Sequence, residues 1–333
     1  QVALFDQSCY PIFTLKGSDA MEVLNHISAN NIDVPINRIV YTQWLNERGG
    51  IEADVTITRV SADEYMIVSS CANEVRDFHW LTSHIPAEAH AIAFNGGSGT
   101  CILGVMGPRS RDLLNSLSSS DVSNEALPYY HSKQIELGHS QVRVNRLSYV
   151  GELGYELYIP TEFVGHVFDL LMVAGQEFGL KLAGYHAMNA CRVEKSYKHM
   201  GHDIDDETDP RMVGLGFAVD LNKEEFIGRD AIVSLDTTQT KRLVNIALKG
   251  DKPPLLYHDE PIFLGDQLVG ITTSGMWGYR VNRSLGLAML EDPMGVTKRG
   301  LAESAEEQGY EVEVASTRYP IEVQLAAFYD PTS

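Results

Sequence analysis

Three short segments of the sequence hold the residue types that chemistry needs. The first runs from Tyr41 through a Gly49-Gly50 pair to Asp54. Adjacent glycines after polar residues indicate a tight turn, so Asp54 is expected to open the strand that follows. Its carboxylate either faces a cavity, where it could move a proton, or lies in solvent at the strand end. Residue type alone leaves both interpretations open.

The second segment carries Tyr149 and Glu156 on either side of Gly151 and Gly154. Two glycines allow the chain to fold back, so that the phenol and the carboxylate could face one space. A carboxylate there could accept hydrogen bonds from both the ring N–H and the exocyclic NH₂ of an aminopyrimidinone. The alternative is an ordinary hairpin with an exposed glutamate.

The third segment contains His199 and His202, followed by four acidic residues between positions 203 and 207. These are metal-ligating types, but their spacing matches no closed zinc pattern, so a solvated acidic loop is favoured and no metal is expected. Just upstream, Arg192 and Glu194 are two residues apart on an expected helix. They cannot share a helix face, so we expect them to form separate tertiary ion pairs.

Composition limits the classes of function. The chain has 333 residues, 44% of them hydrophobic and 21% charged, with a formal net charge of −19. It has enough apolar residues to build cores and no run of about 20 that could span a bilayer. The acidic balance argues against nucleic acid and anionic membranes as partners. The four cysteines are far apart in sequence and are expected to be reduced core thiols.

Strands and helices alternate through about residue 235. A strand at 13–17 precedes a helix that Ser18 or Asp19 would cap, with Glu22 as the capping-box partner. Hairpins are expected within 55–68 and 142–160, a buried strand at 101–107, and helices at 77–85, 164–172 and 187–197. The repeated order predicts an α+β domain of two similar halves over 1–238. Short strands between turns predict a small β-barrel over 239–333.

Several of these segments together resemble one family. They are LNERGGIEADVT (45–56), VMGPRSRDLL (105–114), SYVGELGYELYIP (148–160), CRVEKSYKHMGHDI (191–204), GLGFAVDLNKEEFIGRDA (214–231) and TSGMWGYRVNRSLGLAML (273–290). The chain resembles the folate-binding aminomethyltransferase family of the glycine cleavage T-protein. The likeness is closer to the C-terminal half of dimethylglycine and sarcosine dehydrogenases and oxidases. It implies two similar α/β halves that form a folate-binding region, plus a C-terminal β-barrel.

The resemblance also implies roles for particular residues. Asp54 would face the reactive nitrogens of tetrahydrofolate, Tyr149 and Glu156 would contact the pteridine, and Tyr41 would line the folate channel. Asp54 and Tyr149 would be the catalytic pair. The chain departs from the T-proteins at Met188, where those proteins carry an arginine.

The implied activity is capture of the formaldehyde-level carbon of an oxidised N-methylamine, or of its imine, as 5,10-methylenetetrahydrofolate. The oxidation itself requires FAD, which is expected only if a flavin domain, covalently joined or separate, accompanies this chain. A start at Gln1 instead of Met fits a chain with such a domain on its N-terminal side. The expected location is the cytoplasm, or the mitochondrial matrix in a eukaryote.

Three other functions stay open at this point. One is a stand-alone glycine cleavage aminomethyltransferase that accepts an aminomethyl group from a lipoyl carrier. The second is a folate-dependent demethylase that takes a methyl group directly. The third is a non-catalytic folate-binding or regulatory module that has kept the fold.

Overall fold

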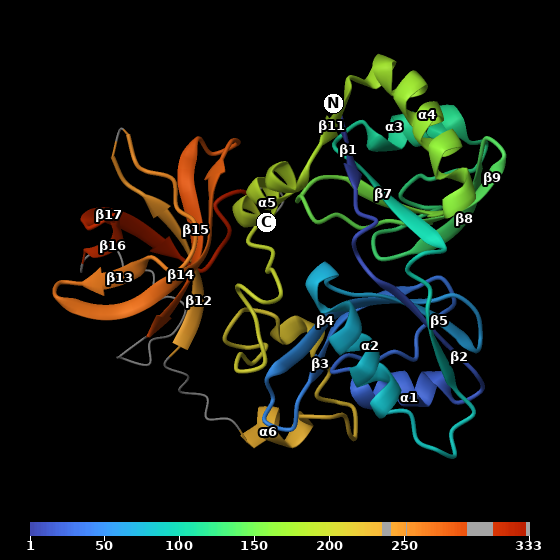
Figure 1. Ribbon diagram of the computed structural model, residues 1–333, viewed down its shortest axis with the longest axis horizontal. Coiled ribbons are helices and arrows are strands. Elements are labelled where there is room, and N and C mark those ends of the chain that lie inside the picture. Colours follow the sequence, from blue (N-terminus) through green and yellow to red (C-terminus); the bar gives the residue numbers. More distant parts are fainter. Residues whose placement is uncertain (235–240, 251, 292–308, 331–333) are drawn as a thin grey trace. The chain divides into compact units, whose positions relative to one another are not determined.

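The computed structural model describes residues 1–234, 241–250, 252–291 and 309–330 (Figure 1). Its contacts divide the chain into two compact units. The first combines 1–185 with 218–229, and the second combines 186–217 with the chain from 230 onward.

The first unit contains a five-stranded sheet with helices on one face. Its strands, in spatial order, are β3 (Ile39–Leu45), β4 (Ile51–Arg59), β5 (Glu64–Val68), β2 (Ile12–Lys16) and β6 (Ile92–Asn95). Helices α1 (Ala20–Ile27) and α2 (Glu74–Ser83) bury apolar side chains against it. Alternation along the strands directs Trp44, Ala53 and Val55 into this core, so the intervening residues face the other way.

A six-stranded sheet completes the first unit. Its order is β11 (Leu180–Ala183), β1 (Val2–Asp6), β7 (Thr100–Met106), β10 (Gly154–Pro160), β9 (Ser140–Asn145) and β8 (Ser132–Leu137). Helices α3 (Ser110–Leu117) and α4 (Val164–Ala174) contribute to its core. On the side away from that core, Ile102 and Tyr158 pack with Ile12 and Met66 of the five-stranded sheet, so the two sheets meet there.

The two sheets arise from the same succession of elements. The order β2-α1-β3-β4-β5-α2-β6 is repeated as β7-α3-β8-β9-β10-α4-β11. The pairing order is also repeated, with one change. In the first half β2 pairs directly with β6, whereas in the second half β1 lies between β7 and β11. The predicted two similar halves are therefore confirmed.

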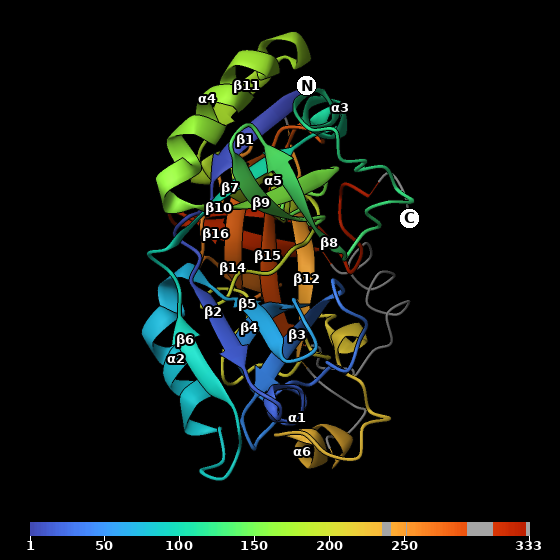
Figure 2. The same cartoon turned by 90° about the vertical axis from the view of Figure 1, so that its right-hand side faces the viewer.

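The second unit contains a closed barrel, as predicted. Its strands, in order around the barrel, are β12 (Lys241–Leu248), β15 (Arg283–Glu291), β14 (Gln267–Gly278), β13 (Pro261–Leu264), β16 (Tyr310–Val314) and β17 (Thr317–Gln324). Figure 2 shows β12, β15 and β14 side by side. The remaining helices are α5 (Tyr185–Glu194), α6 (Arg229–Ser234), η1 (Cys71–Asn73), η2 (Thr161–Phe163), η3 (Gly175–Phe178) and η4 (Gly216–Ala218).

Two local expectations were wrong. Asp19 is the N-cap residue of α1, but its side chain does not bond the helix; Oδ2 instead accepts from the backbone N–H of His90 at 2.7 Å. The helix expected to reach residue 197 ends at Glu194, because Ser196 takes a left-handed conformation with φ 61°. The predicted boundary at 238/239 follows the change in element type, whereas the contacts group 186–217 with the barrel.

None of the helices in the described ranges is long and apolar enough to cross a membrane.

Candidate functional site

Strands β3 and β4 place Tyr41, Gln43 and Asp54 on one face of the five-stranded sheet. Gln43 and Asp54 are direct partners in the register, and Tyr41 lies two residues before Gln43 on the same face. This is the face opposite the helix-covered core. Asp54 is partly buried in the middle of β4, so the expectation that it opens the strand was wrong.

The turn before β4 fixes this register. Asn46 Oδ1 accepts hydrogen bonds from the backbone N–H groups of Arg48 and Gly50, both at 3.0 Å. Gly49 has a φ of 86°, a conformation that glycine adopts without strain. The hydrogen bonds of Asn46 thus stabilise the turn around the Gly-Gly pair. Strand β4 begins immediately after this turn, at Ile51.

The Asp54 carboxylate has two neighbours on β3. Gln43 Nε2 donates to Oδ1 at 2.8 Å, and the Tyr41 hydroxyl forms a second hydrogen bond. Burial raises the pKa of Tyr41 well above its ordinary value, and the negative charge of Asp54 adds to the shift. The phenol therefore stays protonated and donates to the carboxylate. The sequence singled out Tyr41 and Asp54 but missed Gln43, although a period of two from Tyr41 points to it.

Tyr149 lies close to this pair. Burial is the main cause of the raised pKa values of Tyr41 and Tyr10, and the nearby Tyr149 phenol contributes to both. The structure therefore brings Tyr41, Asp54 and Tyr149 together in the first unit. Tyr10, in the chain between β1 and β2, lies near Tyr149, which no local sequence pattern indicates.

Glu156 lies on β10 in the six-stranded sheet. Burial raises its pKa, and the Tyr158 hydroxyl opposes that shift by donating to Oε2 at 2.7 Å. The structure therefore does not support the alternative that Glu156 is an exposed glutamate in an ordinary hairpin. Gly151 takes a φ of 67°, and a Cβ at Gly154 would lie 2.7 Å from the carbonyl oxygen of Leu147. Both glycines are needed for the chain to turn back between Tyr149 and Glu156.

The neighbour of Glu156 connects the two sheets. Asn145 on β9 is the direct partner of Glu156, and its Nδ2 donates to Thr58 Oγ1 at 3.1 Å. Thr58 is four residues after Asp54 on the same face of β4. The hydrogen bond from Asn145, the register partner of Glu156, thus reaches β4, the strand that carries Asp54.

Three amide oxygens on the facing sides of the two sheets, a region called the layer below, lack a hydrogen-bond donor. Within the described part of the chain, Gln7 Oε1, Gln43 Oε1 and Asn145 Oδ1 are buried without a partner. A buried acceptor left unsatisfied costs about 1–3 kcal/mol, so such atoms usually find a donor on water or on a ligand. Gln43 lies beside Asp54, and Asn145 and Gln7 lie beside Glu156, so these atoms make the two sheet faces a candidate site for a donor-rich molecule.

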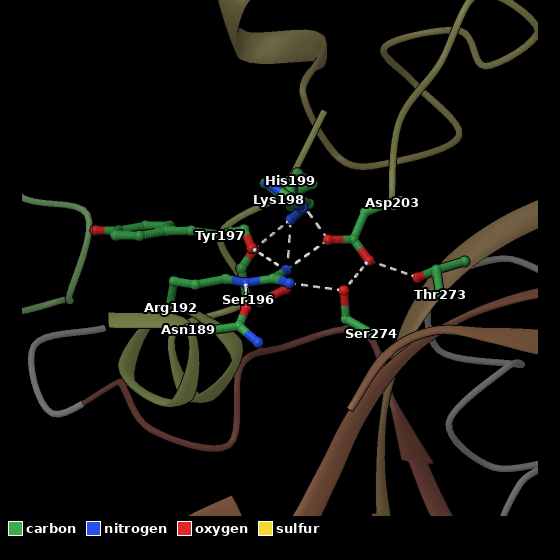
Figure 3. A network of polar contacts seen from close by, with 9 residues as sticks. All are labelled: Asn189, Arg192, Ser196, Tyr197, Lys198, His199, Asp203, Thr273 and Ser274. Carbon is green, nitrogen blue, oxygen red and sulfur yellow. Dashed lines mark hydrogen bonds and ion pairs between the residues drawn. The ribbon is translucent and has the colours of Figure 1, made fainter. Parts of the chain in front are cut away.

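The third sequence segment folds differently from the expectation. Asp203 belongs to a loop predicted to be solvated, but its side chain is 0% exposed and its Oδ2 lies 2.5 Å from Arg192 Nη1. Figure 3 shows how Thr273 and Ser274 of β14 donate to Oδ1 of the same carboxylate, at 2.5 and 2.8 Å. The loop prediction was wrong for Asp203 because this network compensates its burial.

Arg192 and Glu194 do form separate ion pairs, as predicted. Arg192 pairs with Asp203, and Glu194 Oε2 pairs with Arg280 Nη1 at 3.2 Å. His199 stacks on His202 with ring centroids 4.7 Å apart, and burial, helped by the Arg192 charge, lowers the pKa of His199 to about 4. Among the residues that the structure describes, no group of three or more His, Cys, Asp or Glu side chains is arranged to hold a metal ion.

All four cysteines are free, yet none is a core residue. Cys9 is exposed, and Cys71, Cys101 and Cys191 are partly exposed. The expectation that these thiols lie in the core was therefore wrong. Cys9 and Cys71, far apart in sequence, also interact through their side chains.

Two family models together match nearly the whole chain. The GCVT N-terminal domain matches residues 1–223, and the glycine cleavage T-protein C-terminal barrel domain matches residues 241–330. The chain belongs to the glycine cleavage T-protein family.

The curated relatives are of several kinds. 4-Methylaminobutanoate oxidase (formaldehyde-forming) of Paenarthrobacter nicotinovorans is 39% identical over 99% of this chain and 39% of its own length. Mitochondrial dimethylglycine dehydrogenase of Homo sapiens is 31% identical over 96% of this chain and 36% of its own length. An aminomethyltransferase of Halothermothrix orenii is 32% identical over 86% of this chain and 79% of its own length. The chain thus spans about two fifths of the two oxidoreductases.

A further relative has a regulatory name. The mitochondrial pyruvate dehydrogenase phosphatase regulatory subunit of Mus musculus is 30% identical over 97% of this chain and 38% of its own length. Among solved structures, aminomethyltransferase T of the glycine cleavage system from Bartonella henselae matches with a TM-score of 0.84. That match covers 98% of this chain and 86% of the other at 20% identity, which establishes the shared fold.

Proposed function

We propose that the chain transfers a formaldehyde-level one-carbon unit from an oxidised N-methylamine of the dimethylglycine or sarcosine type to tetrahydrofolate, giving 5,10-methylenetetrahydrofolate and releasing the demethylated amine. The observation that carries the proposal is the Asp54 carboxylate, held by Gln43 and Tyr41 beside Tyr149. The relatives named as a formaldehyde-forming oxidase and as dimethylglycine dehydrogenase support the choice of amine.

The residues of this layer fit a reduced folate. Tetrahydrofolate, when bound, supplies the nucleophilic nitrogens that take up the carbon. Its ring carries several N–H groups, and the layer offers the Glu156 carboxylate and unpartnered amide oxygens to receive them. Glu156 and Tyr149 would hold the ring, and Tyr41 would line the approach to it.

Asp54 would stabilise a positive charge and accept a proton. Attack by an amine nitrogen creates a positive centre, which a nearby carboxylate stabilises, and the same carboxylate can accept the proton that leaves. Gln43 and Tyr41 hold the carboxylate in one orientation, so little reorganisation is needed during the reaction. Groups positioned in this way typically contribute about 10²–10⁴-fold to a rate.

The first test separates binding from catalysis at Asp54. Asp54→Asn should bind tetrahydrofolate like the wild type but form methylenetetrahydrofolate about 10²–10⁴-fold more slowly, because the amide cannot take the proton. Binding is measured by calorimetry, and product formation is measured with an imine or formaldehyde as the carbon source.

Asp63→Asn is the matched control, since Asp63 is an exposed residue in the turn between β4 and β5 of the same sheet. Equal rates for the wild type and Asp54→Asn would leave Asp54 with a structural role only.

We further propose that this chain works with a flavin domain that oxidises the amine, either joined to it or separate. The support is that the chain matches only 39% of the 4-methylaminobutanoate oxidase and 36% of the dimethylglycine dehydrogenase. The test is to sequence the coding region upstream of the codon for Gln1 and the neighbouring genes. Absence of any flavin-binding sequence in either place would overturn it.

Two other candidate functions are each favoured by one relative. The aminomethyltransferase of Halothermothrix orenii, matched over 79% of its length, favours a stand-alone enzyme that draws on a lipoyl carrier. The phosphatase regulatory subunit favours a non-catalytic module. Turnover only with an aminomethyl-lipoyl donor would support the first, and folate binding with no turnover of any one-carbon donor would support the second.

A further inference from the structure

We propose that Gln7 and Asn145 flank Glu156 as two additional hydrogen-bond acceptors, and that the three together select the amine-bearing edge of a 2-amino-4-oxo pterin ring. The inference rests on the proposed function for its ligand class and assigns two specificity-determining residues to that site.

Asn145 lies directly beside Glu156. The two are register partners in β9 and β10, so their side chains leave the same face of the sheet about 5 Å apart. Asn145 Nδ2 donates to Thr58 Oγ1 at 3.1 Å, and the same side chain hydrogen-bonds to the Tyr158 hydroxyl. These contacts assign the amide nitrogen, so Oδ1 is the atom left as a buried, unpartnered acceptor.

Gln7 reaches the other side of Glu156 because position 104 has no side chain. Gly104 on β7 is the other register partner of Glu156, and a Cβ at Gly104 would lie 2.2 Å from Gln7 Oε1. The Gln7 side chain therefore occupies the place that a residue at 104 would take on that face. Its backbone N–H is tied to the Ile102 carbonyl at 2.9 Å, and the residue is only 2% exposed.

The result is a row of acceptors running across three strands. Among the described residues, Glu156 receives one donor, the Tyr158 hydroxyl, and the two flanking amide oxygens receive none. A ring N–H next to an exocyclic amine presents neighbouring donors to such a row. A ring with a carbonyl oxygen in place of the amine would set acceptor against acceptor, and sites built around buried hydrogen-bonding groups discriminate strongly against such analogues.

A ligand-binding role for Gln7 has a signature that a structural role lacks. Gln7 Oε1 has no hydrogen-bond partner among the described residues, so Gln7→Met keeps the length of the side chain while it replaces an amide whose oxygen is unsatisfied. The free Gln7→Met protein should therefore melt at the same temperature as the wild type or higher, while its affinity for the ligand falls.

The experiment measures tetrahydrofolate affinity by calorimetry, together with displacement by 6-methyltetrahydropterin and by its 2-oxo counterpart. The wild type should be displaced by the amine-bearing ring at a concentration at least about 100-fold lower. Gln7→Met and the paired variant Asn145→Leu with Thr58→Val should each bind tetrahydrofolate about tenfold more weakly, which corresponds to about 1.4 kcal/mol, and should prefer the amine less. Gln141→Met, at an exposed position of β9, is the control and should behave like the wild type.

The outcomes separate this inference from the proposed function. A wild type that binds no reduced folate overturns both. A wild type that binds tetrahydrofolate, with Gln7→Met binding equally well or with both rings displacing alike, overturns the inference alone. If the paired variant fails to fold, Gln7→Met still decides the question.

Discussion

At the scale of single residues, surroundings separate carboxylates that look alike in the sequence. Asp54 is partly buried and has Gln43 and Tyr41 as hydrogen-bonding neighbours on β3. Asp203 is fully buried and paired with an arginine and two hydroxyls. The first arrangement suits a group that works on a bound molecule. The second satisfies the carboxylate inside the protein, which suits a structural group.

Glu156 should make ligand binding depend on pH. Burial raises its pKa, so protonation begins at a higher pH than for an exposed glutamate. An N–H donor edge prefers the ionised carboxylate, so affinity for tetrahydrofolate should fall as the pH drops through this pKa. Calorimetry from pH 8 to pH 5 measures the effect.

The stability of the free protein should change in the opposite direction. A carboxyl group whose pKa is raised by folding contributes most to stability below its unfolded pKa, and this contribution is lost as the pH rises through the folded value. Glu156→Gln should weaken both dependences by the part that Glu156 contributes, and Glu162→Gln, at an exposed position of η2, should leave both as in the wild type. Identical pH profiles for the wild type and Glu156→Gln would contradict the raised pKa.

At the scale of elements, one buried ion pair and the hydrogen bonds around it join helix α5 to strand β14. Arg192 on the helix is 3% exposed and donates to Asn189, to the Tyr197 carbonyl, to Asp203 and to Ser274 of β14 (Figure 3). Through these hydrogen bonds, Arg192 and Asp203 hold the helix, the loop after it and the barrel strand in one arrangement.

Breaking that pair from one side should cost more than removing it entirely. Arg192→Met leaves Asp203 buried without a counter-charge and should lower the free energy of unfolding of the second unit by about 3–5 kcal/mol. Adding Asp203→Leu should recover part of the loss, because no uncompensated charge is then buried. Chemical denaturation of the two single variants and the double variant measures the coupling. Additive losses would show that the two side chains act independently.

At the scale of the whole molecule, the C-terminal part of the first family match is shared between the two units. Residues 186–217 group with the barrel, while 218–229 return to the first unit. In the first unit, Lys223 donates to the backbone carbonyls of Asn25, Ser28 and Asn30, around the end of α1. A boundary drawn where strands replace helices therefore does not follow the contacts.

This division predicts how pieces of the chain behave. A piece covering 186–333 should unfold at a higher temperature than one covering 239–333, because only the longer piece retains the pairs Arg192–Asp203 and Glu194–Arg280. Thermal unfolding followed by circular dichroism compares them. Arg192→Met in the longer piece is the control and should remove much of the difference. Equal midpoints for the two pieces would show that α5 and its loop add nothing to the barrel.

The sequence by itself determined the element types, the repeat and the barrel, because hydrophobic periodicity and turn residues are local signals. It also pointed to Asp54, Tyr149 and Glu156 through their positions around glycine turns, and to Tyr41 through the resemblance to the family. Only the tertiary structure showed that Gln43 orients Asp54, that Asn145 and Gln7 flank Glu156, and that Asp203 is buried. Those facts depend on strand register and on contacts between residues up to about a hundred positions apart, such as Gln7 with Gly104, which no local pattern encodes.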